Sequence, residues 1–233
     1  MKKIKYAFVV LFFLKSLTAF AESWYQVEVI IFDRINPDLS EERWGDEEPV
    51  IRPDMTELYP NYKMNTDQRL IPYMIMGKKN NRMDGVYRVL KLSSEYRPLT
   101  HLSWQQPATK RRQSRHVHIV ENERKKELSE RSEQESIIEP EFIEDFMKNK
   151  KIIDGSIRIR SNFYLHVDLD LYYFKNLPSD NLTYEKEDEF SNKNLAKLIV
   201  RLKESRKIKL NEIHYFDNPM YGVILQVSRL EES

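Results

Sequence analysis

The sequence predicts an α+β fold that is predominantly antiparallel β-sheet, with one or two short helices and a long irregular N-terminal loop region. Three observations support this prediction: segments in which apolar and polar residues alternate, one clear stretch with helical periodicity, and a concentration of prolines before residue 85. Alternation with one polar face is typical of antiparallel sheets, which contact the core on one side and water on the other. We find no internal repeat, and 233 residues fit one globular domain better than two.

Residues 24–32 are predicted to form the first strand. Tyr25, Val27, Val29 and Ile31 share one face of it. The opposite face mixes polar and apolar residues, which indicates that other parts of the chain cover both faces. We therefore expect a central strand.

A long irregular region and a helix are predicted next. Five of the ten prolines lie between residues 33 and 85, where each fixes φ and withholds an amide donor. Long loops inside a compact domain are often functional. Apolar residues then recur at helical spacing from about residue 82 to 94, which predicts a short amphipathic helix that ends before Pro98.

The second half of the chain is predicted to consist mainly of strands. The strongest pattern is a single long strand at residues 157–174, with a polar face opposite an apolar one. Its apolar face consists of Phe163, Leu165, Val167, Leu169, Leu171 and Tyr173. Weaker patterns predict strands at residues 99–105, 115–120, 198–202, 213–216 and 221–230.

A polar insertion is expected at about residues 108–137. Residues 121–135 contain one aliphatic side chain, Leu128, so this stretch buries too little apolar surface to offset the entropy of ordering it. We therefore predict a flexible insertion. After it, Pro140 and an apolar face at residues 142–147 predict a second helix.

The first 21 residues are predicted to be an export signal. They contain a basic start, an apolar run of nine residues and the small-residue sequence Ala19-Phe20-Ala21. Cleavage after Ala21 would leave a single domain at residues 22–233, a soluble periplasmic or secreted protein without a transmembrane span. The signal contains four of the 38 basic residues and none of the 37 acidic residues. Without it, acidic residues outnumber basic ones, so the cleaved protein is mildly acidic. We therefore expect no nucleic-acid partner.

The composition excludes several classes of enzyme. The five glycines are too widely spaced for a G-x-G-x-x-G or P-loop cradle, and no G-x-S-x-G elbow is present. The absence of cysteine excludes a thiol nucleophile, a disulfide and a Cys-ligated zinc site. We expect no cofactor, no metal and no catalytic residue.

Four ordered blocks of sequence stand out along the chain. They are WYQVEVIIF after the signal, YRPLTHLSWQQP from Tyr96, IRIRSNFYLHVDLDLYY from Ile157, and EIHYFDNPMYGVILQV from Glu212. Together these blocks resemble the CsiV family of periplasmic peptidoglycan-binding proteins from gammaproteobacteria. The resemblance implies a non-catalytic protein that binds peptidoglycan. It also implies support of a bifunctional penicillin-binding protein through that enzyme's outer-membrane lipoprotein activator, and so a role in cell-wall biogenesis and cell shape.

The predicted polar strand face supplies one set of ligand-binding candidates, His166, Asp168 and Asp170. Successive members would lie roughly 7 Å apart, and imidazole with carboxylates could bind a metal or transfer protons. A solvated strand face with polar cross-strand pairs explains the same pattern. His116 and His118 are interpreted as part of a cationic segment rather than as metal ligands.

Two further sets complete the candidates. His101, Trp104 and Gln105 could form a carbohydrate surface, since aromatic rings stack on sugars and amides bind hydroxyls, although a buried Trp explains the same residues. The other set surrounds the last turn, where Asp-Asn-Pro also has good turn chemistry. It comprises His214, Tyr215, Asp217, Asn218 and Tyr221.

Two alternative functions remain open from the sequence. The first is a metal-dependent or carboxylate-based cell-wall hydrolase that uses His166, Asp168, Asp170 and His214, although no spacing among the acidic residues selects a catalytic pair. The second is a pure protein–protein adaptor without affinity for the wall.

Overall fold

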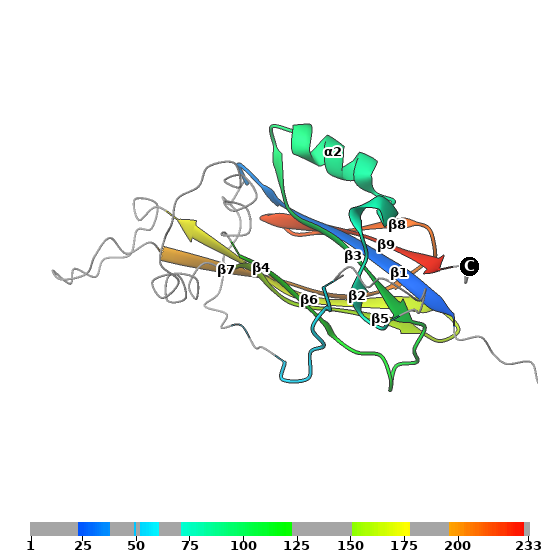
Figure 1. Cartoon of the computed structure of the whole chain (residues 1–233). Helices are drawn as coiled ribbons and strands as arrows, with labels where there is room; N and C mark the ends of the chain where they lie inside the picture. Colours follow the sequence, from blue (N-terminus) through cyan, green and yellow to red (C-terminus); the bar gives the residue numbers. More distant parts are fainter. Residues whose placement is uncertain are drawn as a thin grey trace, which may run out of the picture.

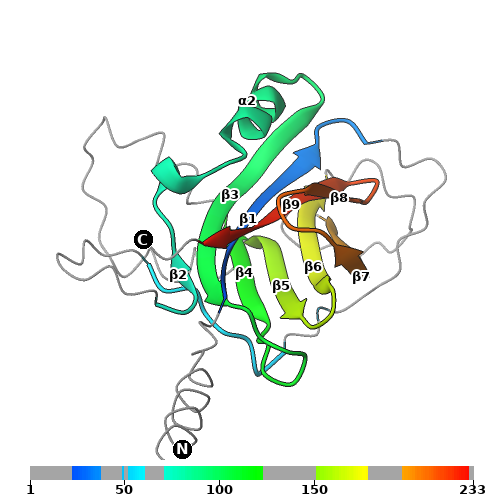
Figure 2. The same ribbon diagram turned by 90° about the vertical axis from the view of Figure 1, so that its right-hand side faces the viewer.

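The computed structural model describes residues 23–37, 49, 52–60, 71–122, 151–177 and 196–230. They form two antiparallel sheets packed face to face (Figures 1 and 2). Sheet A has the order β2-β3-β1-β9-β8, and sheet B has the order β4-β5-β6-β7. The prediction of mainly antiparallel sheet with a short helix is confirmed.

The elements have the following bounds. Sheet A contains β1 (Trp24–Arg34), β2 (Met74–Ile75), β3 (Tyr96–Pro107), β8 (Ile213–Asp217) and β9 (Tyr221–Leu230). Sheet B contains β4 (Val117–Asn122), β5 (Lys151–Ser161), β6 (Leu165–Leu177) and β7 (Ala196–Ile208). A 3-10 turn, η1 (Lys78–Asn80), and the helix α2 (Asp84–Leu92) lie between β2 and β3.

The core lies between the two sheets. Each strand sends alternate apolar side chains inward, as the period of two requires. Val27 and Val29 of β1, Val167 of β6 and Leu225 of β9 are fully buried in this layer. Full burial of each such side chain contributes roughly 1.5–3 kcal/mol, so the interface between the sheets is the main source of stability.

Strand β1 is the central strand of sheet A, as its sequence predicts. It pairs with β3 on one side and β9 on the other. Its second face is also covered, because α2 and the turn before it lie across the outer side of sheet A (Figure 1). Ile30 and Phe32 pack there with Met83 and Leu90, which explains why this face mixes polar and apolar residues.

The long strand predicted at residues 157–174 is instead a hairpin. Strand β5 ends at Ser161 and β6 begins at Leu165, with direct pairing of Arg160 with His166 and of Ile157 with Leu169. Phe163, predicted to face the core, lies in the connecting turn and is 91% exposed. The alternation continues in phase across the short turn, so the sequence pattern alone does not reveal the reversal.

Strand β3 starts earlier than predicted and includes Pro98. Thr100 lies opposite Ile31 and Pro98 lies opposite Phe32, so Leu99 is the extra residue of a bulge. Proline is tolerated in strands at edges and bulges because it has no amide hydrogen to donate. The helix is shorter than predicted, at 84–92 instead of 82–94.

Three predicted segments fall partly or wholly outside the described residues. They are the export signal, the insertion beyond Asn122 and the helix after Pro140. Residues 117–122 of the predicted insertion form β4, an edge strand of sheet B.

Candidate functional site

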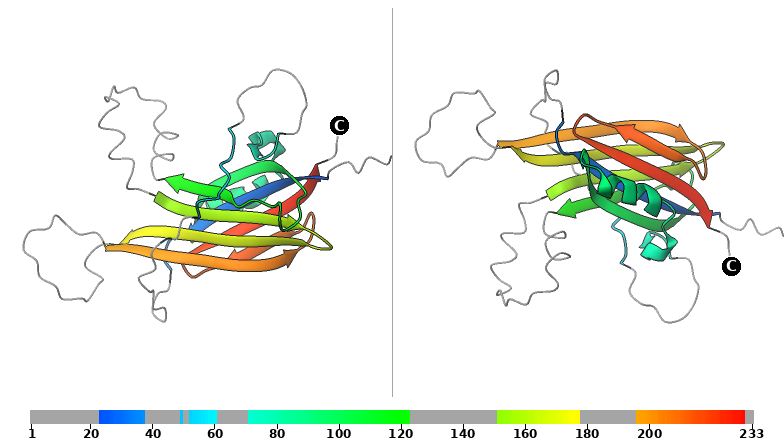
Figure 3. Two further views of the ribbon diagram at one scale, coloured as in Figure 1. Left: turned by 90° about the horizontal axis from the view of Figure 1, so that it is seen from below. Right: turned by 90° about the horizontal axis from the view of Figure 1, so that it is seen from above.

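The outer face of sheet B, which faces the viewer in Figure 3 (left), carries rows of polar residues set by the strand register. Registered pairing across β5, β6 and β7 aligns Arg160 with His166 and Lys207 in one row. The next row aligns Arg158 with Asp168 and Ser205. Asp170 lies in the third row between Ser156 and Lys203. The three candidates of the predicted polar face therefore do share one face, as expected.

Both aspartates of this face are held by arginine. The Arg160 guanidinium donates Nε–H and Nη2–H to the Asp168 carboxylate at 2.7 and 2.8 Å. Arg201 likewise donates its Nε–H and Nη2–H to the two oxygens of the Asp170 carboxylate, at 2.8 and 3.1 Å. Ser205 Oγ also donates to Asp168 at 2.6 Å. Burial acts to raise the pKa of Asp168, but the hydrogen bonds from Arg160 and Ser205 outweigh it and lower that pKa.

A groove of about 610 Å³ runs over this face. Its floor is formed by β5, β6 and β7, and its walls include Arg52 before β2 and Arg111 in the turn before β4. The charged lining residues comprise five cations and three carboxylates. They are Arg52, Arg111, Arg158, Arg160, Lys203, Asp168, Asp170 and Glu204.

Arg158 lines the groove and contacts neutral groups. Its Nε–H donates to Ser114 Oγ at 2.7 Å, and its Nη2–H donates to the Arg111 carbonyl. Its Nη1 lies 3.4 Å from His116 Nε2. Burial together with the positive charges of Arg52 and Arg158 lowers the pKa of His116, so the ring is neutral and accepts from Arg158.

Two aromatic side chains are exposed at the β5–β6 turn, next to the groove. Phe163 is almost fully exposed, and Tyr164 is exposed beneath the Lys207 ammonium, which lies 3.0 Å from the ring centroid. His166 is fixed beside them, because its Nδ1 contacts the Tyr164 carbonyl at 3.2 Å. The β5–β6 turn, which follows the lining residue Arg160 closely along the chain, thus combines aromatic and cationic groups.

His101 belongs to a buried network beneath α2 on the opposite side of the molecule. Its Nε2 lies 2.7 Å from Glu28 Oε1, and the His101 ring stacks on Tyr87 at 4.8 Å between centroids. The Glu28 carboxylate also accepts the backbone N–H groups of Arg82 and Met83. Burial acts to raise the pKa of Glu28, but these hydrogen bonds outweigh it and lower that pKa. This network fastens the start of α2 to sheet A.

Trp104 and Gln105 lie in the interior. Trp104 is 0% exposed in the core, with its Nε1–H donated to Gln106 Oε1 at 2.8 Å, and no sugar ring can stack on it there. Gln105 is buried and donates to the Ile71 carbonyl at 2.9 Å. The structure places Trp104 in the core and Gln105 in a buried hydrogen bond on the other face of β3, so neither residue forms an open carbohydrate surface.

The residues around the last turn support that turn. Asn218 Oδ1 accepts the Met220 N–H, and the Tyr215 hydroxyl donates to Asp217 Oδ1 at 2.5 Å. Asp217 also pairs with Arg34 at 2.9 Å. Burial and the Asp217 carboxylate raise the pKa of Tyr215 to about 12.

The other two candidates of this group lie apart from the sheet-B groove. His214 Nε2 contacts the backbone of Lys209 at 3.2 Å. Tyr221 is fully buried, packs against the tilted ring of Tyr173 and donates to the Leu171 carbonyl, so it fastens sheet A to sheet B. The structure therefore brings together His166, Asp168 and Asp170 but separates them from the other candidates.

Sequence reasoning missed the cations of the groove. Arg158 and Arg160 occur in the sequence IRIRS, and Lys203, Ser205 and Lys207 alternate in β7. This is the same alternation that selected His166, Asp168 and Asp170 in β6. Applying it to the neighbouring strands would have placed these residues on the same face once the hairpin was recognised.

His118 is also part of sheet B rather than of a loose cationic segment. Its Nε2 lies 2.8 Å from Asp154 Oδ1, and its Nδ1 lies 2.5 Å from Glu57 Oε1. The hydrogen bond with Asp154 raises the pKa of His118 against the opposing effect of burial, and the contact with Glu57 raises it further. Nearby backbone bonds join Thr56 to residues 116 and 118, so His118 holds this loop to the edge of β4.

The described part of the chain offers neither a clustered metal site nor a membrane-spanning helix. It contains no group of three or more His, Asp or Glu side chains placed to hold a metal ion. None of its helices is long and apolar enough to cross a bilayer.

A family model described as "Peptidoglycan-binding protein, CsiV" matches residues 4–230 of the chain. The chain belongs to the CsiV family. This result confirms the resemblance of the four sequence blocks and makes the chain a peptidoglycan-binding protein of the cell envelope by family. Neither a curated protein nor a solved structure matches it.

Proposed function

We propose that this CsiV-family protein binds peptidoglycan without cleaving it and does so through the outer face of sheet B. The observation that carries the proposal is the groove of about 610 Å³ over β5, β6 and β7, lined by charged side chains in fixed positions. A wall polymer offers hydroxyl, amide and carboxylate groups, and such a lining can hydrogen-bond all three.

The state of the two aspartates supports binding over hydrolysis. Glycoside hydrolysis uses a carboxylic acid whose pKa is raised so that it can protonate the leaving group. The pKa of Asp168 is lowered instead, because Arg160 and Ser205 hydrogen-bond to its carboxylate. Asp170 is held in a two-point ion pair with Arg201. Each carboxylate therefore holds its arginine partner in a fixed orientation and is poorly suited to protonate a leaving group.

The protein acts in the periplasm after cleavage at about Ala21 and supports cell-wall synthesis. Its partner is the outer-membrane lipoprotein activator of a bifunctional penicillin-binding protein. The predicted export signal and the resemblance of the four sequence blocks support this part of the proposal.

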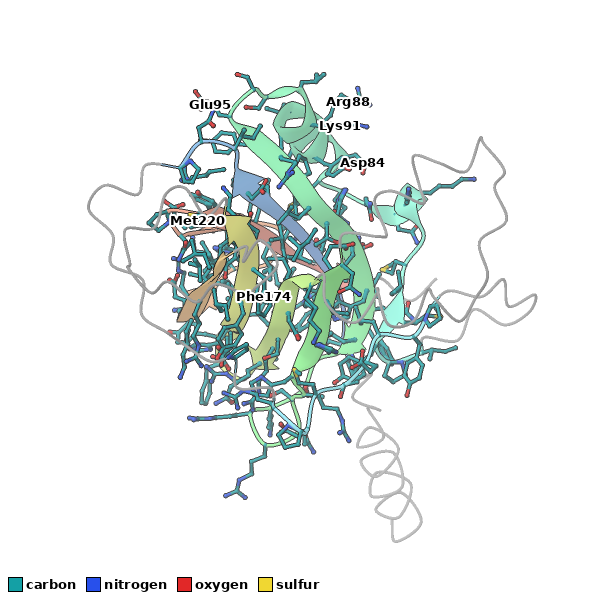
Figure 4. The ribbon with its side chains drawn as sticks, turned by 90° about the vertical axis from the view of Figure 1, so that its left-hand side faces the viewer. Asp84, Arg88, Lys91, Glu95, Phe174 and Met220 are labelled. Carbon is teal, nitrogen blue, oxygen red and sulfur yellow. The ribbon has the colours of Figure 1, made fainter. Side chains whose placement is uncertain are left out.

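Co-sedimentation with purified sacculi tests the binding surface. The mature chain, residues 22–233, should pellet with sacculi, and the double variant Lys203→Ala/Lys207→Ala should remain largely in the supernatant. The matched control is Arg88→Ala/Lys91→Ala, which removes the same charge from exposed positions on α2, on the far side of the molecule (Figure 4). Equal pelleting of the two double variants would contradict the proposed surface.

Two further measurements separate the alternatives. Chromatography of sacculi after incubation should show no released muropeptides, whereas release would indicate a hydrolase. A pull-down with the lipoprotein activator should succeed for the wild type. Success there combined with failure of sacculus binding would indicate a pure adaptor.

A further inference from the structure

The groove over sheet B contains more positive charge than its own carboxylates neutralise. Arg160 is matched by Asp168, and Arg201 by Asp170. Arg52 also approaches Asp170, at 3.6 Å. The third lining carboxylate, Glu204, is engaged by Arg206 through contacts of 2.8 and 2.5 Å. All three acidic side chains of the lining are therefore already paired with arginine.

Three lining cations, Arg111, Arg158 and Lys203, have no ion pair with a carboxylate in the part of the chain that the structure describes. They come from different elements: the turn before β4, strand β5 and strand β7. Because all three line the same groove, their charges add in one place.

Arg158 keeps donors available for a ligand. A guanidinium has five N–H donors, and the contacts of Arg158 to Ser114, Arg111 and His116 use three of them. The remaining two suffice for the two-point recognition of a carboxylate. The same three contacts fix the orientation of the guanidinium, which reduces the entropy lost on binding.

The titration of neighbouring groups agrees with this charge excess. Burial lowers the pKa of Arg158, and the positive charges of Arg160, Arg111 and Arg52 lower it further against the opposing effect of Asp168. The pKa of His116 is also lowered, first by burial and then by Arg52 and Arg158. Neighbouring arginines thus contribute to both shifts after burial, which is consistent with the excess of cations that the ion pairs leave in the groove.

The wall polymer carries its negative charge in its peptides. In the intact strand, the lactyl carboxyl of the muramic acid is converted to an amide, so the sugar chain is neutral. The stem peptide keeps carboxylates on its D-glutamate, diaminopimelate and terminal D-alanine residues. We propose that the sheet-B groove binds a carboxylate of the peptidoglycan stem peptide, with Arg158 and Lys203 as the contacting cations.

This proposal rests on the proposed function and states which part of the polymer the groove recognises. A groove of about 610 Å³ lies within the roughly 300–1,000 Å³ range typical of ligand sites. Phe163 and Tyr164 at the β5–β6 turn, a few residues beyond the lining residue Arg160, are exposed aromatic side chains of the kind on which sugar rings stack. The charged centre would then supply specificity for the peptide.

Calorimetric titration with three probes tests the proposal. The probes are a synthetic disaccharide tetrapeptide, the same compound with its carboxyl groups converted to carboxamides, and a neutral oligomer of N-acetylglucosamine. The first should bind, the second should bind at least about tenfold more weakly, and the third should resemble the second. Binding of the first should also weaken as salt is added.

Single variants identify the contacting cations. Arg158→Gln and Lys203→Gln should each weaken binding of the acid form about tenfold and leave binding of the carboxamide form unchanged. Lys203 is exposed, so this variant tests the idea even if Arg158→Gln disturbs the groove. Arg88→Gln and Lys91→Gln on α2 are the matched controls and should have no effect.

The possible failures are distinguishable. If wild-type protein pellets with sacculi but binds the acid and carboxamide probes equally, the stem-peptide assignment is wrong and the proposed function stands. Unchanged affinity in both sheet-B variants leads to the same conclusion. If sacculi do not pellet the protein at all, both proposals are wrong.

Discussion

The two outer faces of the sandwich differ in which groups pair with their carboxylates. On sheet A, the Glu28 side chain is 2% exposed and is satisfied by two backbone N–H groups and His101. On sheet B, Asp168 and Asp170 remain partly exposed and are paired with arginines. The carboxylate of sheet A binds a segment of its own chain, whereas the charges of sheet B border an open groove.

Apolar packing follows the same division. Ile30, Phe32 and Ile224 on the outer side of sheet A pack against Met83 and Leu90, so α2 covers this face (Figure 3, right). The corresponding rows on sheet B consist of Arg, His, Asp, Lys and Ser, which cannot form such a cluster. The comparison shows that the outer face of sheet A is covered by apolar packing under α2, whereas the outer face of sheet B carries charged side chains around an open groove.

The largest expected effect comes from Gly155→Ala in sheet B. Gly155 has φ of +153°, and an added Cβ would lie 2.2 Å from the Asp170 carbonyl oxygen. Because this clash is with backbone, we expect a loss of about 3 kcal/mol in the free energy of unfolding, measured by urea denaturation. Gly85→Ala in α2 is the control, since nothing lies within 4 Å of its added Cβ. Equal stability of the two variants would contradict the tight contact between β5 and β6.

The next effect tests the buried carboxylate of sheet A. Glu28→Gln should cost about 2 kcal/mol, because the neutral amide satisfies the Arg82 and Met83 N–H groups and His101 less well. Asp168→Asn on the open face should cost less than about 1 kcal/mol. Similar losses in the two variants would remove the distinction between the faces.

The lowered pKa of Glu28 leads to a prediction about the pH dependence of stability. The folded-state pKa of Glu28 lies below its ordinary value of 4.5. Its stabilisation is therefore complete above pH 4.5 and is lost as the pH falls through the lowered value. Denaturation curves of Glu28→Gln should show a weaker loss of stability in this acidic range than wild type.

A smaller effect with the opposite sign is expected at His118 on the edge of sheet B. Its folded-state pKa lies above 6.5, so its stabilisation is complete below pH 6.5 and is lost as the pH rises through the raised value. His116 contributes the reverse slope, because its pKa is lowered. The difference between wild type and His118→Gln isolates the His118 contribution and should shrink from pH 6 to pH 8. A difference that grows with pH would contradict the pairing with Asp154 and Glu57.

The smallest effect concerns Tyr215 on β8. Asp217→Asn should lower the Tyr215 pKa from about 12 toward 10, but only partly, since burial is the larger cause and remains. Absorbance of the phenolate measures this shift, and Tyr215→Phe identifies the tyrosine responsible. Stability should change by less than about 1 kcal/mol, because the Asp217 pair is exposed.

Local periodicity was sufficient to predict most strands and the helix. The alternation in β1 and the spacing of Met83 and Leu90 report the local backbone and the faces that become buried. The position of the β5–β6 turn could not be predicted in this way. The alternation passes through Asn162 and Phe163 in phase, and no glycine or proline marks the reversal.

The candidate site was predictable only in part. His166, Asp168 and Asp170 share a face within one strand, so sequence spacing alone groups them. Arg158 and Lys203 reach them through pairing between strands, and Arg52 and Arg111 through loops, which sequence spacing does not encode. For Trp104 the sequence allows both a carbohydrate surface and a buried core position, because its burial depends on which sheet packs against β3.

Strand β1 pairs with β3 and with β9, so sheet A can form completely only after the last described strand is available. Trp24 lies opposite Leu230 in the sheet, so the first described strand gains its second partner from the last one. Contacts this distant in sequence form slowly, because a long chain must close first. A chain shortened before residue 221 would lack β9 and leave the edge of β1 open to pairing with another molecule. Loss of the final ten paired residues should thus cause aggregation.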